Sequence, residues 1–346
     1  MRQDTARPDP RLALLARWLE HDLDLAGADV APASADASFR RYFRVRHGAR
    51  TLIAMDAPPG REDLGPFVAV ARALRALGVT VPQILEEDRA QGFLLMTDLG
   101  STHYLAAFAA GADVERLYRD ATTALLRIQT HGLAAAAALP AYDAAVLDRE
   151  LQLFPEWFLG RHFGTPPAAA EQALIGRVSA RLAASAREQP QVFVHRDYHS
   201  RNLMVLPAGN PGILDFQDAL RGALTYDLVS LFKDCYIVWP RPRVLGWVED
   251  FRRRALAEGI VIPGSGADFV RWFDLMGLQR HLKVLGIFAR LWYRDGKSAY
   301  LRDLPTVLDY VLETTSAYAE LAEFDAFLRA AVVPGFAAAQ QRALGR

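Results

Sequence analysis

The amino-acid sequence predicts an α+β protein of two lobes, a small N-terminal lobe with an antiparallel sheet and a larger, mainly helical C-terminal lobe. Strand-like runs gather before residue 99, and from Ser101 onwards apolar residues recur mainly at the helical period. A chain of 346 residues is also long enough for about two domains of ordinary size. We therefore divide the chain into lobes of residues 1–99 and 100–346.

The N-terminal lobe is expected to begin with an amphipathic helix, because the first 22 residues carry charges on both sides of a short apolar stretch. The small-residue segment 28–38 is expected to be a flexible loop. Strand-like runs on either side of residues 47–50 predict a β-hairpin. A helix over residues 62–77 and a second hairpin with its turn near residues 88–92 complete the lobe.

In the C-terminal lobe, the helical period predicts helices over Val114–His131, Tyr142–Phe158 and Ala168–Arg187. One β-element interrupts them: the strand-like run QVFV, a polar loop HRDYHSRN, and a second run that a PAGNPG turn folds back on itself before Asp215. Further helices are expected from Tyr226 to Leu328.

Composition excludes several classes of protein. Hydrophobic residues at 51% and charged residues at 23% are typical of a globular chain. The net charge of zero and the scattered Lys and Arg residues argue against nucleic-acid binding. Cys235 is the single cysteine, which excludes an intramolecular disulfide and favours a reducing cytoplasm. No run of about 18 apolar residues is present, so no membrane association is expected.

The polar loop carries the pattern from which a function is predicted. His195, Asp197 and Asn202 follow the spacing HxDxxxxN of a kinase catalytic loop. The turn between the two short strands places Asn202 and Asp215 at the same end of the predicted pair, where an amide and a carboxylate oxygen suit Mg²⁺. Asp197 can then accept a proton from a substrate hydroxyl. The alternative is that these are polar turn residues that cap local backbone groups.

These segments resemble the aminoglycoside phosphotransferase and choline kinase-like family, whose members have a two-lobed, protein-kinase-like fold. HRDYHSRNLMV is similar to the catalytic loop of that family, GILDFQDA to its metal-binding segment, and ALTYDLVSL to a downstream segment that supports the loop. The likeness extends more weakly over nearly the whole chain. It implies an ATP-dependent, Mg²⁺-requiring phosphotransferase with a nucleotide-binding N-terminal lobe and a catalytic and acceptor-binding C-terminal lobe.

Carried over residue by residue, the resemblance implies that Asp197 is the catalytic base and that Asn202 and Asp215 are the Mg²⁺ ligands. It gives His195 and Asp227 structural roles. The segment FLLMTDL resembles the strand and inter-lobe linker that lie beside adenine. The nucleotide contacts expected in this linker are Met96, Thr97 and Leu99.

Within the family, the greatest similarity is to bacterial cell-wall sugar kinases that phosphorylate the anomeric hydroxyl of N-acetylmuramate and N-acetylglucosamine. It is carried by SADASFRRYFRV, LIAMDAPP, DFQDALRGALTYDLVSLFKDCYIVWP and QRHLKVLGIFARLWYRDGK. This resemblance implies an amino-sugar acceptor and a role in peptidoglycan recycling.

The nucleotide side departs from the usual kinase pattern. The third strand, residues 51–56, contains no Lys, and the following helix has no Glu at the position expected for its partner. Residues 35–38 contain none of the glycines of a phosphate-binding loop. We hypothesise that Arg40 or Arg41 contacts the nucleotide phosphates instead. The alternative is that these arginines are solvated charges of an edge hairpin.

On the acceptor side, His199, Gln217 and Asp218 are nearest in sequence to the proposed base and metal ligands. The basic segment 280–294 supplies Arg280 and Arg294, which could bind the lactyl carboxylate of N-acetylmuramate through their guanidinium groups. The alternative is that they form the solvated face of an amphipathic helix.

Two other functions stay open. An aminoglycoside or other small-alcohol phosphotransferase would use the same loop, although its polycationic substrate favours an acidic acceptor site. A nucleotide-binding regulator with little catalysis would explain the absent Lys and glycines, but it would not need Asp197. The sequence does not indicate protein partners or the oligomeric state.

Overall fold

The computed structural model describes residues 9–35 and 39–345 of the chain, which divides into two compact units. The first unit contains the residues up to Thr102 together with Met204–Asp218. The second contains His103–Leu203 and the chain from Ala219 onwards. The segment that follows the HRDYHSRN loop thus belongs to the first unit. The assignment of nucleotide binding to residues 1–99 and of catalysis to residues 100–346 stays a prediction.

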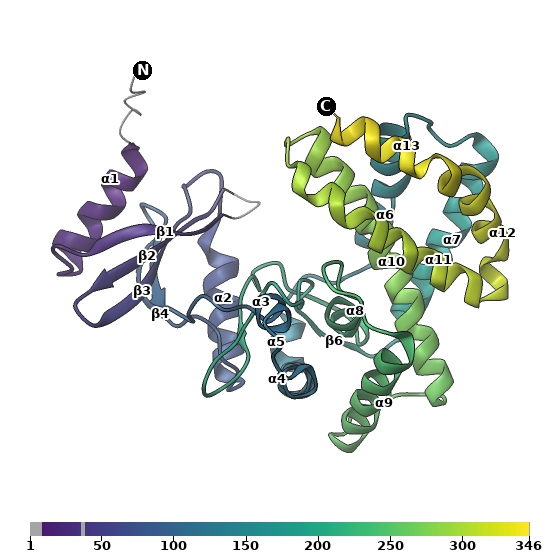
Figure 1. Cartoon of the computed structure of the whole chain (residues 1–346). Helices are drawn as coiled ribbons and strands as arrows, with labels where there is room; N and C mark the ends of the chain where they lie inside the picture. The colour runs from purple at the N-terminus through teal and green to yellow at the C-terminus, as the bar shows by residue number, and fades with distance from the viewer. Residues whose placement is uncertain (1–8, 36–38, 346) are drawn as a thin grey trace. The chain divides into compact units, whose positions relative to one another are not determined.

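The first unit is built on an antiparallel sheet of five strands in the order β1-β2-β3-β5-β4 (Figure 1). Both predicted hairpins are confirmed. The first pairs His47 with Arg50 across its turn, and the second turns at Gly92, whose φ of 78° suits glycine. The strands are β1 (Asp29–Ala35), β2 (Arg41–His47), β3 (Arg50–Asp56), β4 (Ile84–Asp88) and β5 (Phe93–Thr97).

The expectation of a flexible loop over residues 28–38 is wrong for β1. Its small residues have low strand propensity, but pairing with β2 from Asp29↔Arg46 to Ala35↔Arg41 supplies the backbone hydrogen bonds. Pro32 is tolerated because β1 is an edge strand with an irregularity between Pro32 and Ser34. Residues 36–38 of the segment discussed as a phosphate-binding loop lie outside the described residues.

One face of the sheet is covered by the predicted N-terminal helix, α1 (Pro10–Arg17), and by the π-helical turn Trp18–Asp22 that continues it (Figure 1). Asp9 begins the helix by accepting hydrogen bonds from the amides of Arg11 and Leu12. The ring centroids of Trp18 and Phe93 are 5.6 Å apart in a core that also includes Val45. Alternation along β2, β3 and β5 places this core on one face.

Asp56, at the end of β3, is fully buried. Its carboxylate accepts hydrogen bonds from the guanidinium groups of Arg11 and Arg41. A buried carboxylate is costly unless it is paired, and the two arginines come from α1 and β2. The side chain of Asp56 therefore fastens the N-terminal helix to the sheet.

The helix predicted over residues 62–77 is α2 (Leu64–Ala76), which begins after Asp63. Phe67 packs against Phe216, with ring centroids 4.9 Å apart, and so connects α2 to the segment 204–218. In that segment, β7 (Leu203–Met204) pairs with β8 (Gly212–Ile213), as the PAGNPG turn predicted.

The second unit is mainly helical, and its long helix α10 (Gly266–Tyr293) contacts α7, α8, α9 and α11 (Figure 1). The helix α4 has the predicted bounds, and α7 is within one residue of them. In the described part of the chain, no helix is long and apolar enough to span a membrane. The other α-helices described in this unit are α3 (Tyr104–Ala109), α4 (Val114–His131), α5 (Leu133–Ala137), α6 (Ala144–Leu151), α7 (Ala169–Glu188), α8 (Tyr226–Phe232), α9 (Arg241–Ala257), α11 (Leu304–Ala317), α12 (Ala322–Phe327) and α13 (Val333–Leu344). Two π-helices (Phe154–Phe163 and Leu328–Val332) and two 3-10 helices (Ser298–Asp303 and Ala319–Leu321) lie between them.

A two-stranded antiparallel sheet in this unit positions the HRDYHSRN loop. The strand β6 (Gln191–Val194) was predicted, but its partner β9 (Leu220–Ala223) was not. Val194 pairs with Leu220 at the end of the sheet and is fully buried. The loop therefore begins at a fixed point.

Gly286 lies in α10 where the helix passes very close to the backbone of Leu153. A Cβ atom at this position would lie 2.4 Å from the carbonyl carbon and oxygen of Leu153. We expect Gly286→Ala to lower the free energy of unfolding by about 1–3 kcal/mol because the backbone must shift. Gly246→Ala in α9, where no atom lies within 4 Å, is the matched control and should be neutral or stabilising. Equal urea midpoints for the two variants would contradict the close approach.

A buried network of charges joins α8, α10 and α11. Lys233 is buried and its Nζ lies 3.2 Å from Asp274 and 3.1 Å from Glu313.

The Nε2 atom of His281 donates to the carbonyl oxygen of Lys233 at 3.0 Å, and its ring stacks on Tyr310 with centroids 4.8 Å apart. Burial and the positive charge of Lys233 lower the pKa of His281 to about 3. The folded protein therefore keeps this imidazole neutral at pH values where an unfolded chain protonates it.

This difference predicts a pH dependence of stability. Below the ordinary His pKa the unfolded state binds a proton that His281 cannot bind, so stability is lost as the pH falls from about 6.5 towards 3. Between pH 7.5 and 5 the wild type should lose about 2 kcal/mol more than His281→Gln, whose amide can still donate to the Lys233 carbonyl. Urea unfolding at the two pH values measures it. Parallel losses in both proteins would show that His281 accepts a proton in the folded state.

Candidate active site

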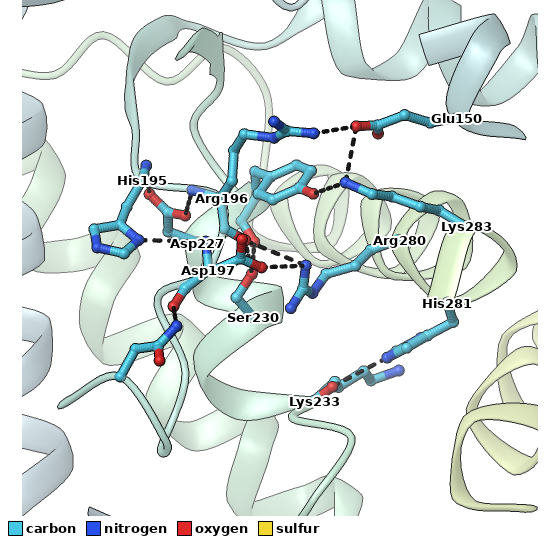
Figure 2. Close-up of polar contacts among 12 residues, drawn as sticks. Glu150, His195, Arg196, Asp197, Asp227, Ser230, Lys233, Arg280, His281 and Lys283 are labelled. Atoms are coloured by element: carbon cyan, nitrogen blue, oxygen red, sulfur yellow. Dashed lines mark hydrogen bonds and ion pairs between the residues drawn. The ribbon is translucent and has the colours of Figure 1, made fainter. Parts of the chain in front are cut away.

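The HRDYHSRN loop is held at its start by a carboxylate from α8. The two oxygens of Asp227 accept hydrogen bonds from the amides of His195 at 2.7 Å and Arg196 at 3.0 Å (Figure 2). Asp227 and His195 are fully buried. Burial raises the pKa of Asp227 to about 7, although the two amide hydrogen bonds and the charge of Arg280 favour its ionised form. This carboxylate lies behind the loop, so its contacts are with the backbone.

Asp197 comes next and presents its side chain outwards, with 42% of it exposed. Arg196 immediately before it has a φ of 77°, a left-handed conformation that is unusual for a residue with a side chain. Partial removal from water favours the protonated form of Asp197, but the positive charges of Arg280 and Lys283 lower its pKa below the ordinary value. The carboxylate is therefore ionised at neutral pH and can accept a proton.

Asn202, one of the two predicted metal ligands, is the last residue of the loop. Its Nδ2 atom donates to the carbonyl oxygen of Asp197 at 3.0 Å, and its amide donates to the carbonyl oxygen of His199 at 2.9 Å. Because the side-chain nitrogen faces the loop, the side-chain oxygen is directed to the other side. The structure thus brings Asn202 together with Asp197.

Asp215, the other predicted ligand, belongs to the first unit. Its φ is 62°, again left-handed for a residue with a side chain, and strained backbone of this kind is typical of functional sites. Its carboxylate accepts a hydrogen bond from Gln217 at 2.7 Å, and Gln217 also donates to Asp218 at 3.3 Å. An amide oxygen and a carboxylate are hard donors of the kind that Mg²⁺ binds, so the chemistry of the predicted pair fits this ion.

His199 is the predicted acceptor residue within the loop. Its ring packs edge-on against Tyr236, with centroids 5.5 Å apart. Among the described residues, no hydrogen-bond partner is present for its buried Nδ1 atom. Burial lowers the pKa of His199, so the ring is neutral and can exchange a hydrogen bond with a ligand.

The two arginines predicted from the segment 280–294 have different surroundings. Arg280 is only 6% exposed, and its Nη1 atom lies 3.9 Å from the Asp197 carboxylate. Arg294 is 56% exposed and pairs with Asp295 at 2.7 Å. The two positions are about 21 Å apart along the helix. Only Arg280 is brought to the loop.

Two residues near the loop were not selected from the sequence. Glu150 in α6 accepts hydrogen bonds from Arg196 and Tyr142, and Lys283 pairs with it at 2.8 Å (Figure 2). Lys283 follows Arg280 by one helical turn, so the i, i+3 spacing was a usable signal. Glu150 is 46 residues from its partner Arg196 and carries no local signal.

The predicted nucleotide residues lie at the end of β5. Met96 is buried, and the Thr97 hydroxyl oxygen accepts a hydrogen bond from the amide of Gln83 at 2.9 Å. Next to them Arg44 of β2 pairs with Asp98 at 2.7 Å, which attaches the linker to the sheet ahead of Leu99. Arg41 is engaged by Asp9 and Asp56 on the face that α1 covers, and Arg40 precedes β2.

Comparisons with known proteins give the family. Residues 29–271 match the model of a phosphotransferase enzyme family. The N-acetylmuramate/N-acetylglucosamine kinase of Pseudomonas aeruginosa is 48% identical over 92% of this chain and 96% of its own length. The kinase of the same name from Pseudomonas putida is 46% identical over 91% and 95%.

Solved structures agree on the fold. Choline kinase LicA from Streptococcus pneumoniae has a TM-score of 0.58 at 12% identity, covering 90% of this chain and all of its own. Spectinomycin phosphotransferase, solved with ADP and spectinomycin, has a TM-score of 0.59 at 12% identity, covering 89% and 99%. The predicted two-lobed, protein-kinase-like fold is thereby confirmed. Since the family model covers more than half of the sequence and near full-length relatives are kinases, this chain is a member of the phosphotransferase enzyme family.

Proposed function

We propose that this enzyme transfers the γ-phosphoryl group of ATP to the anomeric hydroxyl of N-acetylmuramate and N-acetylglucosamine, in the cytoplasm and in the recycling of peptidoglycan. The observation that carries this proposal is the 48% identity to a kinase of that name, which extends over nearly the full length of both chains. A supporting observation is the exposed, ionised carboxylate of Asp197 on a rigid loop.

In the proposed reaction, Asp197 orients the acceptor hydroxyl and accepts its proton while the hydroxyl oxygen bonds to the γ-phosphorus. The bond from phosphorus to the bridging oxygen breaks, and ADP leaves with that oxygen. Phosphoryl transfer needs little covalent help from a protein, so positioning and charge stabilisation account for most of the catalysis. His195 and Asp227 support the loop from behind in this proposal.

We propose that the Asn202 side-chain oxygen and the Asp215 carboxylate hold Mg²⁺. When bound, this ion neutralises charge on the phosphate oxygens. The hydrogen bond from Asn202 to the Asp197 carbonyl orients the amide for this role. In this proposal, the strained left-handed backbone of Asp215 directs its carboxylate towards the ion.

For the nucleotide, we propose contacts from Met96, Thr97 and Leu99 to the base and from Arg40 or Arg41 to the phosphates. A phosphate would compete with two carboxylates for Arg41. For the acceptor sugar, we propose a site beside Asp197 that draws on candidates from the loop, the Asp215 segment and α10. These are His199, Gln217, Asp218 and Arg280, whereas Arg294 lies about 21 Å from Arg280 along the helix and is not among them.

Consumption of ATP in the presence of single acceptors tests the proposal. The panel contains N-acetylmuramate, N-acetylglucosamine, kanamycin, choline and homoserine, each with Mg²⁺, and the product is identified by mass and by loss of reducing-end reactivity. Turnover with the two amino sugars is the expected result. Turnover with kanamycin alone would establish the aminoglycoside alternative, and turnover with none of the five would favour the nucleotide-binding regulator.

A further inference from the structure

We propose that Arg280 is a positioning residue, which holds Arg196 in its left-handed conformation and thereby aims the carboxylate of Asp197. The proposal rests on the assignment of Asp197 as the base. It gives Arg280 a role that acts through the loop backbone and is the same for every acceptor.

Arg196 needs such support because its backbone conformation is unfavourable. A side-chain-bearing residue in the left-handed region is strained by about 1–3 kcal/mol and persists only where its surroundings hold it. Any relaxation of this residue would rotate the peptide that leads directly into Asp197. The geometry of the base therefore depends on how firmly Arg196 is held.

The backbone amide, the backbone carbonyl and one guanidinium nitrogen of Arg196 have partners within the second unit (Figure 2). Its amide donates to Asp227 at 3.0 Å, and its guanidinium group donates to Glu150. Its carbonyl oxygen accepts hydrogen bonds from the Nη1 atom of Arg280 and from the hydroxyl of Ser230, both at 3.2 Å. The donor from Arg280 is a group that also lies 3.9 Å from the carboxylate of Asp197.

The Nη1 atom of Arg280 lies between the two groups that matter. It donates to the carbonyl oxygen of Arg196 and lies 3.9 Å from the Oδ1 atom of Asp197. The side chain cannot swing away, because it is 6% exposed and its guanidinium carbon lies 5.7 Å from the ring centroid of Tyr226. A buried, charged donor of this kind makes a stronger and more directional contact than a neutral one.

The neighbouring turn of α10 supports the other end of Arg196. Lys283 pairs with Glu150 at 2.8 Å, and Glu150 in turn binds the guanidinium group of Arg196. Because these contacts do not involve Arg280, its replacement leaves the side chain of Arg196 held and removes one of the two donors to the carbonyl oxygen, the other being Ser230. The effect of Arg280 on Asp197 can therefore be measured separately.

A direct contact with the acceptor makes a different prediction. The Nε atom of Arg280 has no hydrogen-bond partner among the described residues, and N-acetylmuramate carries a lactyl carboxylate that N-acetylglucosamine lacks. If Arg280 bound that carboxylate, its loss would harm only the reaction of N-acetylmuramate. A positioning residue affects the two reactions equally.

The experiment compares Arg280→Gln with the wild type on both amino sugars. We expect kcat to fall about 100-fold with each, because a displacement of the base by about 1 Å costs that much, while the KM for ATP stays unchanged. Arg280→Lys should recover part of the loss, since an ammonium group can still donate to the Arg196 carbonyl. Arg271→Gln, in the same helix and paired with Glu320 at 2.8 Å, is the matched control and should keep wild-type kcat.

Two results would overturn the proposal: a loss confined to N-acetylmuramate, or a kcat for Arg280→Gln close to that of the wild type. Should Arg280→Gln fail to fold, Ser230→Ala removes the other donor to the Arg196 carbonyl and should lower kcat about fivefold. An unchanged kcat in that variant would also count against the proposal. If the wild type uses another alcohol instead, the proposed function fails, and the same kcat ratios are then measured with that alcohol.

Discussion

Replacing Asp197 by Asn is expected to lower kcat about 1,000-fold while the KM for ATP stays near its wild-type value. An amide of the same shape cannot accept the proton of the acceptor hydroxyl, and general base catalysis contributes about 100-fold to 10,000-fold. Binding of ATP should survive because Asp197 is proposed to contact the acceptor. Steady-state kinetics with saturating N-acetylmuramate and varied ATP give both quantities.

The control for this variant is Asp120→Asn in α4, a carboxylate that pairs with Arg116 one turn away at 3.6 Å. It should retain wild-type kcat. Thermal unfolding of Asp197→Asn should show a midpoint at or slightly below that of the wild type, because the positive charges of Arg280 and Lys283 that lower the pKa of Asp197 also favour its ionised form in the folded protein. A kcat within tenfold of the wild type would show that another group accepts the proton.

Replacing Asp227 by Ala should have the largest effect on stability, about 2–5 kcal/mol of unfolding free energy. Two buried amides, of His195 and Arg196, would lose their acceptor, and each unsatisfied buried donor costs about 1–3 kcal/mol. The catalytic loop should also lose its fixed start, so kcat falls along with stability. Urea unfolding and kinetics on the same preparation measure the two effects.

Asp250→Ala in α9 is the comparison for Asp227→Ala. Asp250 pairs with Arg253 at 2.9 Å on an exposed surface, where such pairs contribute little. Its loss should change the unfolding free energy by less than about 0.5 kcal/mol. Equal destabilisation by the two substitutions would mean that the loop amides are satisfied without Asp227.

Local sequence patterns were sufficient to predict most of the helices and strands. The hairpins, α2, α4 and α7 were predicted because periodicity and turn residues act over a few neighbouring positions. The strand β1 was missed because its small residues have no strand preference of their own. Its conformation is imposed by pairing with β2, an interaction between segments that no local pattern encodes.

The same distinction separates the residues of the site. Asp197 and Asn202 could be recognised because they belong to one loop of fixed spacing, and the structure joins them by a hydrogen bond at 3.0 Å. The contact of Arg280 with the Arg196 carbonyl, by contrast, joins residues 84 positions apart. Because the two residues are so far apart, the sequence could not show whether Arg280 is buried against the loop or lies on a solvated helix face.

By itself, the sequence was sufficient to predict the class of fold, the loop proposed to be catalytic and the chemistry proposed for it, because each of these depends on residues that are adjacent or regularly spaced. Only the tertiary structure decided how the loop is held. Burial removes water from Asp227, Glu150 and Arg280, so that each must find a protein partner, and those partners lie far from them in the chain. The orientation of the Asp197 carboxylate therefore depends on the packing of the second unit.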